Sequence, residues 1–554
     1  MTPFLALAAL AAFGFFSYRR LLTFLHIFQQ EEYDGRRFLA WLRARRAFDR
    51  RASGALAGAL AGALVAALAM APVAGGWALP VFLGLAAAAL AAVGAIEDDP
   101  RKVGKKPLAP TQRARRILRL AWGIDMAAAV AAGIVIGRAS SGMAAVVAAA
   151  IALILLVQAA PLFLVAAARL LAPMERRIND RFLAEARDTL ARLRPTVVAV
   201  TGSYGKTSTK HILAHVLSTV APTLATPGSV NTPLGIARIV REQLKPHHRF
   251  FVVEMGAYGP GSIRRLCDLT PPDLAAVTAV GQAHYERFRS IETVADAKFE
   301  IAAATLARGG HVIVNAELVE RRFYEPRMAQ APGSYSLVTS DPAAGPQAFV
   351  ISDTEQTHEG IAFTLRHAGA EHRITAPLYG LHHCTNVAVA FALACRLGVP
   401  AGTVAAALRS TPQVQHRLQV IRADGQPTLI DDAYNSNPVG FASAVELLGR
   451  LAGERRRRVL VTPGMVELGE RHASEHLRIG KLAGDVADLA LVIGAERIPT
   501  FVEGFEQGSR PGRTLHRFPT FADAKQWLDR NAARDDVVLI ENDLPDLYER
   551  RVTL

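Results

Sequence analysis

Cysteine is scarce in this sequence, since 554 residues contain only three, at Cys267, Cys384 and Cys395. Three widely spaced cysteines fit neither a disulfide framework nor the paired spacing of a zinc site. Such scarcity is typical of a reducing compartment, where thiols stay free. We therefore expect the part of the chain that carries them to lie in the cytoplasm.

A basic surface is also missing from most of the chain. The formal net charge is +14, but the residues up to Glu175 hold 19 Lys+Arg against 9 Asp+Glu. The residues beyond hold 44 against 40, so the excess positive charge is mainly a property of the N-terminal third. The rest of the chain lacks the charge excess that binds a phosphate backbone. No nucleic-acid partner is expected.

The N-terminal third instead contains long apolar runs. They cover approximately residues 3–17, 54–73, 77–96, 120–137 and 143–168. A helix needs about 20 apolar residues to cross a bilayer, so the first and fourth runs are short and the others sufficient. Arg19 and Arg20 follow the first run and no basic residue precedes it, which is typical of an anchor and not of a cleaved signal peptide. We predict an α-helical transmembrane domain with about five helices over residues 1–175.

The flanking charges indicate an orientation. Nine arginines lie in residues 19–51 and eight Lys+Arg in residues 101–119, whereas the connections near 74–76 and 138–142 carry only Arg138. Basic loops stay on the cytoplasmic side. The N-terminus is therefore expected outside and everything after about residue 170 inside. This pattern predicts a multi-pass protein of the cell (inner) membrane with cytoplasmic catalytic domains.

A phosphate-binding loop opens the remaining part of the chain. Residues 196–200 predict a buried parallel strand, and an amphipathic helix is expected through about Thr219. Between them lie Gly202, Ser203, Tyr204, Gly205, Lys206, Thr207 and Ser208. In this arrangement backbone N–H groups and the helix N-terminus face an anion, the lysine meets the terminal phosphates, and the hydroxyl of Thr207 or Ser208 can ligate Mg²⁺.

Further motifs follow the loop in a set order. They are Phe251–Gly256 with Glu254, Ala283–Phe288 with His284, Ala295–Glu300 with Lys298, Gly380-x-His382 with Asn386, His416-Arg417-Leu418, Asp431–Pro438, and Met465–Glu470 followed by His476. Over roughly residues 195–480 this ordered set resembles the Mur ligase family, and most closely the branch that adds D-alanyl-D-alanine. Each motif alone is common, and the order makes the resemblance specific.

The resemblance implies a fold and a reaction. An α/β P-loop central domain is expected over residues 176–412, and a smaller α/β, Rossmann-like C-terminal domain over residues 413–554. The reaction would be the ATP-dependent, ADP-forming joining of a carboxylate and an amine through an acyl phosphate, in the synthesis of cell-wall peptidoglycan precursors. ATP and Mg²⁺ are the implied cofactors.

The resemblance also implies roles for individual residues. Lys206 and Arg417 would face the γ-phosphate, because positioning and charge neutralisation carry most of phosphoryl transfer. Thr207 and Glu254 would ligate one Mg²⁺, and His284 matches a family histidine at a second Mg²⁺.

The resemblance also bears on Lys298, on the residues around adenine and ribose, and on Asn231. Lys298 aligns with a lysine that is carbamylated in several Mur ligases, and a carbamate would make it a carboxylate-like metal ligand in the catalytic set with Lys206, His284 and Arg417. Glu300 is a second residue that the same helix could direct to the metal-phosphate region. Adenine and ribose would be positioned by Asn386, Asp432, Tyr434 and Asn435. Asn231 is a candidate contact to substrate or phosphate.

The sequence departs from the family in ways that leave the substrates open. The membrane domain stands where a small soluble substrate-recognition domain is usual, His383 replaces a family asparagine, and residues 537–546 replace a glycine- and serine-containing loop. The expected carboxylate is therefore a small molecule or a lipid-linked compound, and the expected amine is an amino acid or a dipeptide.

Three alternatives remain at this stage. One is a membrane-associated poly-γ-glutamate-type synthase, which the Asp431–Pro438 motif disfavours. Another is an ATP-driven membrane transporter, which would need a polar pathway, whereas Asp125 is the only acid within the predicted spans. The third is a catalytically dead scaffold, which is disfavoured because the sequence contains Lys206, Glu254, His284 and Arg417.

Overall fold

The structure is a computed structural model that describes residues 2–45, 47–69, 77–102, 107–281, 288, 290–329, 331–433, 436–466 and 468–542. The chain divides into two compact units, and the division follows Ile178. It falls within α6 (Gly142–Leu193), a single 52-residue helix with Pro161 and Pro173 inside it.

The first unit is built from helices alone. Besides α6, it contains α1 (Thr2–Gln30), α2 (Gly35–Ala44), α3 (Arg50–Ala69), α4 (Ala78–Ile96) and α5 (Gln112–Ala139). α4 packs against both α1 and α3, and α5 packs against α1. Within the described residues, α1, α3, α4, α5 and α6 are long and apolar enough to cross a membrane.

The helices of this unit are apolar on their outer faces as well as inside. Phe13, Phe16 and Phe82 are buried between helices, yet Leu68 is 79% exposed and Leu155 63% exposed. Soluble helices place polar residues on their outer face, whereas helices that are apolar all round belong in a large core or a lipid bilayer. The surface is therefore compatible with the five spans that the sequence predicts.

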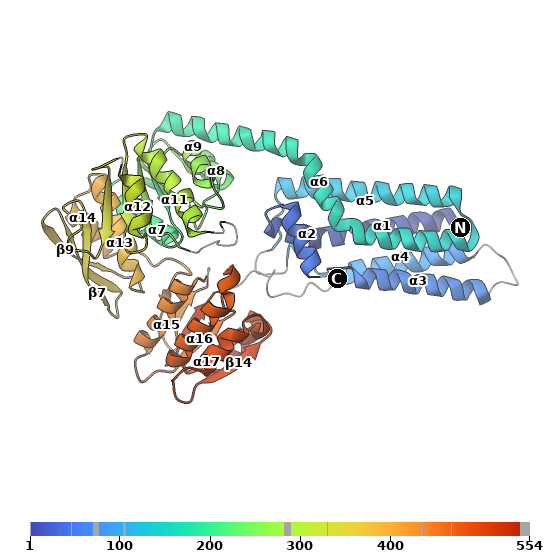
Figure 1. The fold of residues 1–554 in the computed structure, drawn as a ribbon. Helices are drawn as coiled ribbons and strands as arrows, with labels where there is room; N and C mark the ends of the chain where they lie inside the picture. Colours follow the sequence, from blue (N-terminus) through green and yellow to red (C-terminus); the bar gives the residue numbers. More distant parts are fainter. Residues whose placement is uncertain are drawn as a thin grey trace. The chain divides into compact units, whose positions relative to one another are not determined.

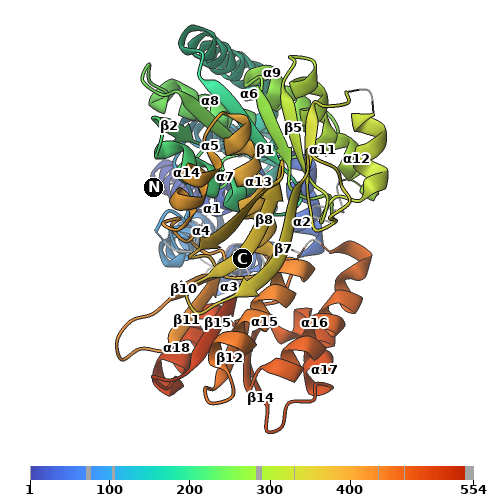
Figure 2. The same ribbon diagram turned by 90° about the vertical axis from the view of Figure 1, so that its left-hand side faces the viewer.

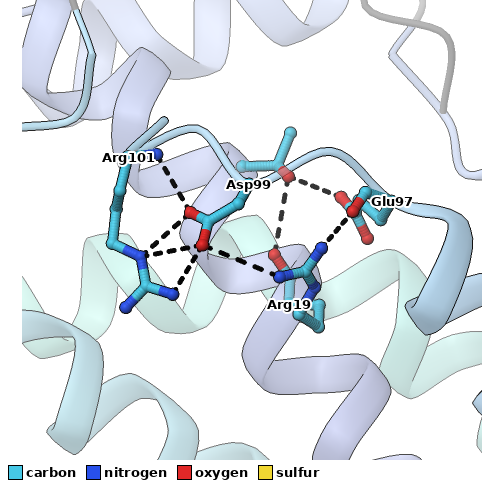
Figure 3. A network of polar contacts seen from close by, with 5 residues as sticks. Arg19, Glu97, Asp99 and Arg101 are labelled. Atoms are coloured by element: carbon cyan, nitrogen blue, oxygen red, sulfur yellow. Dashed lines mark hydrogen bonds and ion pairs between the residues drawn. The ribbon is translucent and has the colours of Figure 1, made fainter. Parts of the chain in front are cut away.

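Helix α1 is longer than the first apolar run, because its arginines continue the helix. Arg20 is buried, and its guanidinium lies 2.8 Å from the Asp49 carboxylate and 3.3 Å from that of Glu97. Arg19 donates to the Glu97 carbonyl, and Asp99 accepts from Arg101 at 2.7 Å. Figure 3 shows the part of this network that joins Arg19 of α1 to Glu97 and Asp99, which follow α4. Pairing of this kind offsets the cost of burying charge.

The second unit contains two α/β sheets. The larger has the order β2-β3-β1-β4-β5-β6-β7-β8-β9. Its strands are β1 (Thr196–Thr201), β2 (Thr223–Ala225), β3 (Phe250–Glu254), β4 (Leu274–Val277), β5 (His311–Asn315), β6 (Tyr335–Thr339), β7 (Phe349–Gln356), β8 (Ile361–His367) and β9 (Ala370–Ala376). The strands from β2 to β7 are parallel, and β7, β8 and β9 pair antiparallel.

Helices cover both faces of this sheet (Figure 2). One face buries α7 (Lys206–Ser218), α13 (His382–Arg396) and α14 (Ala401–Leu408). The other buries α8 (Pro233–Gln243), α9 (Ser262–Leu269), α11 (Ile291–Leu306), α12 (Arg321–Met328) and the end of α6. Because both faces are covered, the parallel strands are almost wholly apolar. This is the layered arrangement expected for a P-loop domain.

The smaller sheet has the order β10-β11-β15-β12-β13-β14. Its strands are β10 (Gln419–Ile421), β11 (Thr428–Asp432), β12 (Arg458–Thr462), β13 (Leu489–Ile493), β14 (Thr514–Phe518) and β15 (Val537–Glu541). All are parallel except β10. Its helices are α15 (Pro438–Ala452), α16 (His472–Val486) and α17 (Pro499–Glu506) on one face and α18 (Phe521–Asn531) on the other. The prediction of a second α/β domain is confirmed.

Candidate active site

The glycine loop joins β1 to α7 in the predicted arrangement. Gly202 and Gly205 have φ angles of 157° and 78°, which residues with a Cβ rarely adopt. A Cβ on Gly202 would collide with Thr278, and one on Gly205 with Asn386. The loop therefore lies flat against these two side chains, with the N-terminus of α7 directly behind it. This leaves backbone N–H groups to face an anion.

Lys206 begins α7 and folds back over the loop. Its ammonium donates to the carbonyl of Gly202 at 2.6 Å and to that of Ser203 at 3.3 Å. Burial lowers the pKa of Lys206, the positive charge of Arg417 adds to this effect, and Glu254 opposes it. Lys206 thus lies near Glu254 and Arg417, the two other residues that were predicted to belong to the same site.

Glu254 ends β3 and collects the polar groups next to the loop. Its carboxylate accepts from Thr207 Oγ1 at 2.9 Å and from Asn231 Nδ2 at 3.0 Å. The Tyr258 hydroxyl donates to Asn231 Oδ1 at 2.9 Å and orients that amide. The structure therefore brings together Thr207, Glu254 and Asn231, three residues that are far apart in the sequence.

Lys210 is a member of this cluster that the sequence analysis missed. Its ammonium lies 3.3 Å from Glu254 Oε2, and both side chains are buried; it also donates to the Gly228 carbonyl. Burial lowers the pKa of Lys210, and Glu254 opposes the shift. The spacing could have predicted this role, because Lys210 follows Lys206 by four residues on the same helix and residues at this spacing share a helix face.

The cluster suits one hard cation. Thr207 Oγ1 and Glu254 Oε2 are oxygen ligands of the kind that Mg²⁺ prefers, and they lie close enough to share one ion. Within the described ranges, no group of three or more His, Cys, Asp and Glu side chains is placed to hold a metal. His284 lies outside the described residues, so the second predicted Mg²⁺ position is not described.

Lys298 lies on α11 with only 4% of its surface exposed. Burial holds its pKa well below the usual range, and the nearby positive charge of Lys206 lowers it further. Glu300 was expected to face the metal-phosphate region together with Lys298, and this expectation is wrong. Its carboxylate accepts from the backbone N–H groups of Gly261 at 2.6 Å and Arg264 at 2.8 Å. Glu300 therefore caps α9, where a negative charge is favourable.

Asn386 and two histidines line the loop from α13. Thr209 Oγ1 lies 3.4 Å from Asn386 Oδ1, and Asn386 Nδ2 lies 3.4 Å from His383 Nδ1. Burial, aided by the charge of Arg417, lowers the pKa of His382 to about 4 and that of His383 well below its usual value. Both imidazoles are therefore neutral at pH 7.

Arg417 lies between the two α/β domains of the second unit. The left-handed residues His416 and Leu418, with φ of 56° and 47°, flank it. Its charge lowers the pKa of Lys206 and Lys210 on one side. On the other side it opposes the raised pKa of Asp432, which burial shifts to about 6.

Asp432 ends β11, and Glu541 ends the neighbouring β15 directly opposite. Asp432 Oδ1 accepts from the Leu418 N–H at 3.1 Å, which ties Asp432 to the turn that carries Arg417. Nothing local in the sequence shows that Glu541 pairs with a residue more than one hundred positions earlier. Tyr434 and Asn435 lie outside the described residues.

These features define a class of protein. A strand–glycine loop–helix unit, a buried carboxylate beside it and an arginine from a second α/β domain form the type of site that suits nucleotide phosphates. Residues 200–394 match the Mur ligase middle domain, and residues 416–541 match the Mur ligase glutamate ligase domain.

Relatives agree with this match. The UDP-N-acetylmuramoyl-tripeptide–D-alanyl-D-alanine ligase of Mycobacterium tuberculosis is 34% identical over 307 residues, which are 54% of this chain and 58% of that protein. The ligase of the same name from Mycobacterium leprae is 32% identical over 375 residues, 62% of this chain and 70% of that protein. The chain belongs to the Mur ligase family. Its match to the M. tuberculosis protein spans less than two thirds of that relative.

Solved structures show the same fold. The crystal structure of MurF from Acinetobacter baumannii is 25% identical with a TM-score of 0.57, covering 68% of this chain and 78% of that one. The MurF ligase of Thermotoga maritima, in complex with ADP, is 26% identical with a TM-score of 0.55, covering 68% of this chain and 82% of that one.

Proposed function

We propose that this chain is a MurF-like, ATP-dependent ligase that forms an amide bond between a carboxylate and an amine during peptidoglycan precursor synthesis. The domains are a membrane domain (1–175), an ATP-binding domain (176–412) and a C-terminal domain (413–554). The observation that carries the proposal is the convergence of Lys206, Glu254 and Arg417 around one glycine loop in a chain of the Mur ligase family.

In this proposal the loop and Lys206 bind the phosphates of ATP, and Arg417 faces the γ-phosphate from the second domain. A carboxylate oxygen of the substrate attacks the γ-phosphorus, and ADP leaves. The amine then attacks the acyl carbon of the acyl phosphate, loses a proton and releases phosphate. Lys206 and Arg417 act by neutralising charge on the phosphoryl group that moves. A Mg²⁺ bound by Thr207 and Glu254 would neutralise further phosphate charge.

The remaining residue roles are part of the same proposal. Asn386 and Asp432, with Tyr434 and Asn435, would position adenine and ribose, and Asn231 would contact substrate or phosphate. His284 and a carbamylated Lys298 would hold a second Mg²⁺. Support for the Lys298 assignment comes from its burial beside Lys206, where an ammonium is disfavoured.

The proposal predicts that ADP release requires both substrates. The full chain, purified in lipid nanodiscs, would be given ATP with a panel of muramyl-peptide and lipid-linked carboxylates and a panel of amino acids and dipeptides. ADP should appear only when one carboxylate and one amine are present, with D-alanyl-D-alanine the leading amine. Equal ADP release without either substrate would contradict ligation and favour an ATPase or transporter. Chain extension with glutamate as both substrates would favour the poly-γ-glutamate alternative.

We further propose that the five apolar helices anchor the protein in the inner membrane with its catalytic domains in the cytoplasm. Cysteines can be introduced singly as Lys102→Cys, between α4 and α5, and as Ser141→Cys, between α5 and α6, and both positions are exposed. An impermeant thiol reagent added to spheroplasts should label Ser141→Cys and not Lys102→Cys. The unsubstituted chain is the control, since Cys267 and Cys384 are buried. Labelling of Lys102→Cys alone would reverse the orientation.

A further inference from the structure

Two carboxyl groups lie side by side at the carboxyl ends of β11 and β15. Asp432 is opposite Glu541 in the parallel register, and the two residues are 8% and 0% exposed. This edge of an open α/β sheet is where such folds bind ligands. Two adjacent carboxyl groups in a buried site do not both ionise, because like charges repel and burial disfavours each charge.

The hydrogen bonds indicate which group holds the proton. Ser436 Oγ donates to Glu541 Oε1, and the Leu418 N–H donates to Asp432 Oδ1. The second oxygen of Glu541, Oε2, is buried and receives no hydrogen bond. An ionised oxygen in that position would be a buried acceptor without a donor, which is costly. A protonated oxygen is itself a donor, and the Asp432 carboxylate is the acceptor that faces it.

Electrostatics support the same assignment. Burial raises the pKa of Glu541 well above its usual value, and the charge of Asp432 raises it further. Burial raises the pKa of Asp432 only to about 6, because Arg417, the Leu418 N–H and Glu541 all favour its charged form. Both directions favour Glu541 as the acid of the pair and Asp432 as the carboxylate.

We propose that Glu541 is a protonated positioning residue, whose acid O–H donates to Asp432 and holds that carboxylate ionised beside Arg417. The inference rests on the proposed function, since Arg417 is the cation assigned to the γ-phosphate. Asp432 then has two donors, the Leu418 N–H and the Glu541 acid, and it anchors the strained turn that presents Arg417. Glu541 acts through Asp432 and touches neither nucleotide nor substrate.

Among the described residues, few charged groups surround Glu541. Strand β11 contributes Asp432 and, one residue earlier, Asp431, which pairs with His416 at 2.8 Å. The turn before β10 contributes Arg417, and the segment before α15 contributes the uncharged Ser436. Strand β12 ends in the uncharged Thr462. Loss of the Glu541 proton would place two adjacent negative charges beside a single arginine.

Two substitutions distinguish the hydrogen-bonding role of Glu541 from the role of its side-chain volume. Glu541→Gln keeps a donor toward Asp432 and an acceptor for Ser436, so it imitates the protonated acid at every pH. Glu541→Leu removes both groups at similar volume. We expect Glu541→Leu to lower kcat/KM for ADP formation at pH 7 by about tenfold or more, the usual effect of leaving a buried charged partner without its hydrogen bond. Glu541→Gln should restore most of that loss.

The pH profile gives a readout that a structural role alone would not change. A raised pKa means that the protonated form of Glu541 persists to higher pH than in an ordinary glutamate and is lost as the pH rises through the pKa of folded Glu541. Activity of the parent should therefore fall on the alkaline side, and Glu541→Gln should lack this fall. Asp536→Asn is the matched control, because Asp536 is a buried acid just before the other end of β15 and pairs with Arg457. It should leave the pH profile unchanged.

Infrared spectroscopy tests the proton without any ligase assay. The difference spectrum between the parent and Glu541→Gln at pH 7 should contain the carbonyl band of a protonated carboxylic acid, contributed by the parent. A carboxylate band in its place would overturn the proposal, as would a Glu541→Gln variant as inactive as Glu541→Leu. A protonated Glu541 in a protein that releases no ADP would instead count against the proposed function alone.

Discussion

Lys206→Ala should abolish ADP formation and amide formation while the protein remains folded and in the membrane. In the structure the Lys206 ammonium donates to two carbonyl groups of its own loop, so its loss should remove little packing. Its absence would remove a cation from the phosphoryl group that moves, and losses of this kind are about 100- to 1,000-fold. ADP release and the thermal melting curve of the purified variant measure the two effects.

Lys210, one helical turn after Lys206, should differ from it in the effect of substitution on stability. Lys210→Ala removes the buried partner of Glu254, and breaking a buried pair by deleting one partner costs about 3 kcal/mol or more of folding free energy. The melting temperature should therefore fall clearly for Lys210→Ala and hardly for Lys206→Ala. Lys245→Ala, at an exposed position before β3, should change neither property. Normal ligation by Lys206→Ala would remove the basis for the ATP site.

Lys298→Ala should also cripple the enzyme, with a loss of about 100-fold or more if one electrostatic contact to the phosphoryl group is removed. Lys298 is 4% exposed, and burial and Lys206 hold its pKa well below the usual range. A neutral buried amine can attack CO₂, form an N–C bond and release a proton, which leaves a carbamate anion. That anion supplies a metal-ligand oxygen where an ammonium would repel Mg²⁺.

Chemical rescue distinguishes a carbamate from an ordinary lysine. Acetate should partly restore Lys298→Ala, because a short carboxylate can fill the vacated ligand position. Lys298→Arg should stay inactive with or without acetate, because guanidinium keeps its bulk and positive charge. The parent protein in ¹³CO₂-containing buffer should show a carbamate carbon resonance that Lys298→Ala lacks. Near-parental activity of Lys298→Arg would show that the lysine has only an electrostatic or structural role.

Several features could be predicted because they depend on residues that are neighbours in the chain. The phosphate loop needs two glycines with left-handed or extended backbone and a lysine at the start of a helix, and all of these lie within Gly202–Ser208. The apolar helices follow from hydropathy, and the predicted run 77–96 corresponds to α4 at Ala78–Ile96. Both α/β sheets could be predicted because apolar strands alternate with amphipathic helices along the chain.

One feature was not predicted and one prediction failed, because each depends on residues that are distant in the chain. The first helix extends to Gln30, beyond the apolar run, because Asp49 and Glu97 pair with its buried Arg20. Glu300 shares a helix with Lys298 but caps α9. Spacing along one helix shows which residues share a face, and it does not show which other element that face contacts.

The amino-acid sequence by itself therefore determined the family, the phosphate loop and the apolar character of the N-terminal third, because each depends on local order and composition. Only the tertiary structure decided that Lys210 neutralises Glu254 and that Glu541 faces Asp432. Sheet register brings the second pair together, and residue types alone do not specify register between strands so far apart in the chain. Burial then changes the chemistry of these groups, since a carboxyl group removed from water retains its proton.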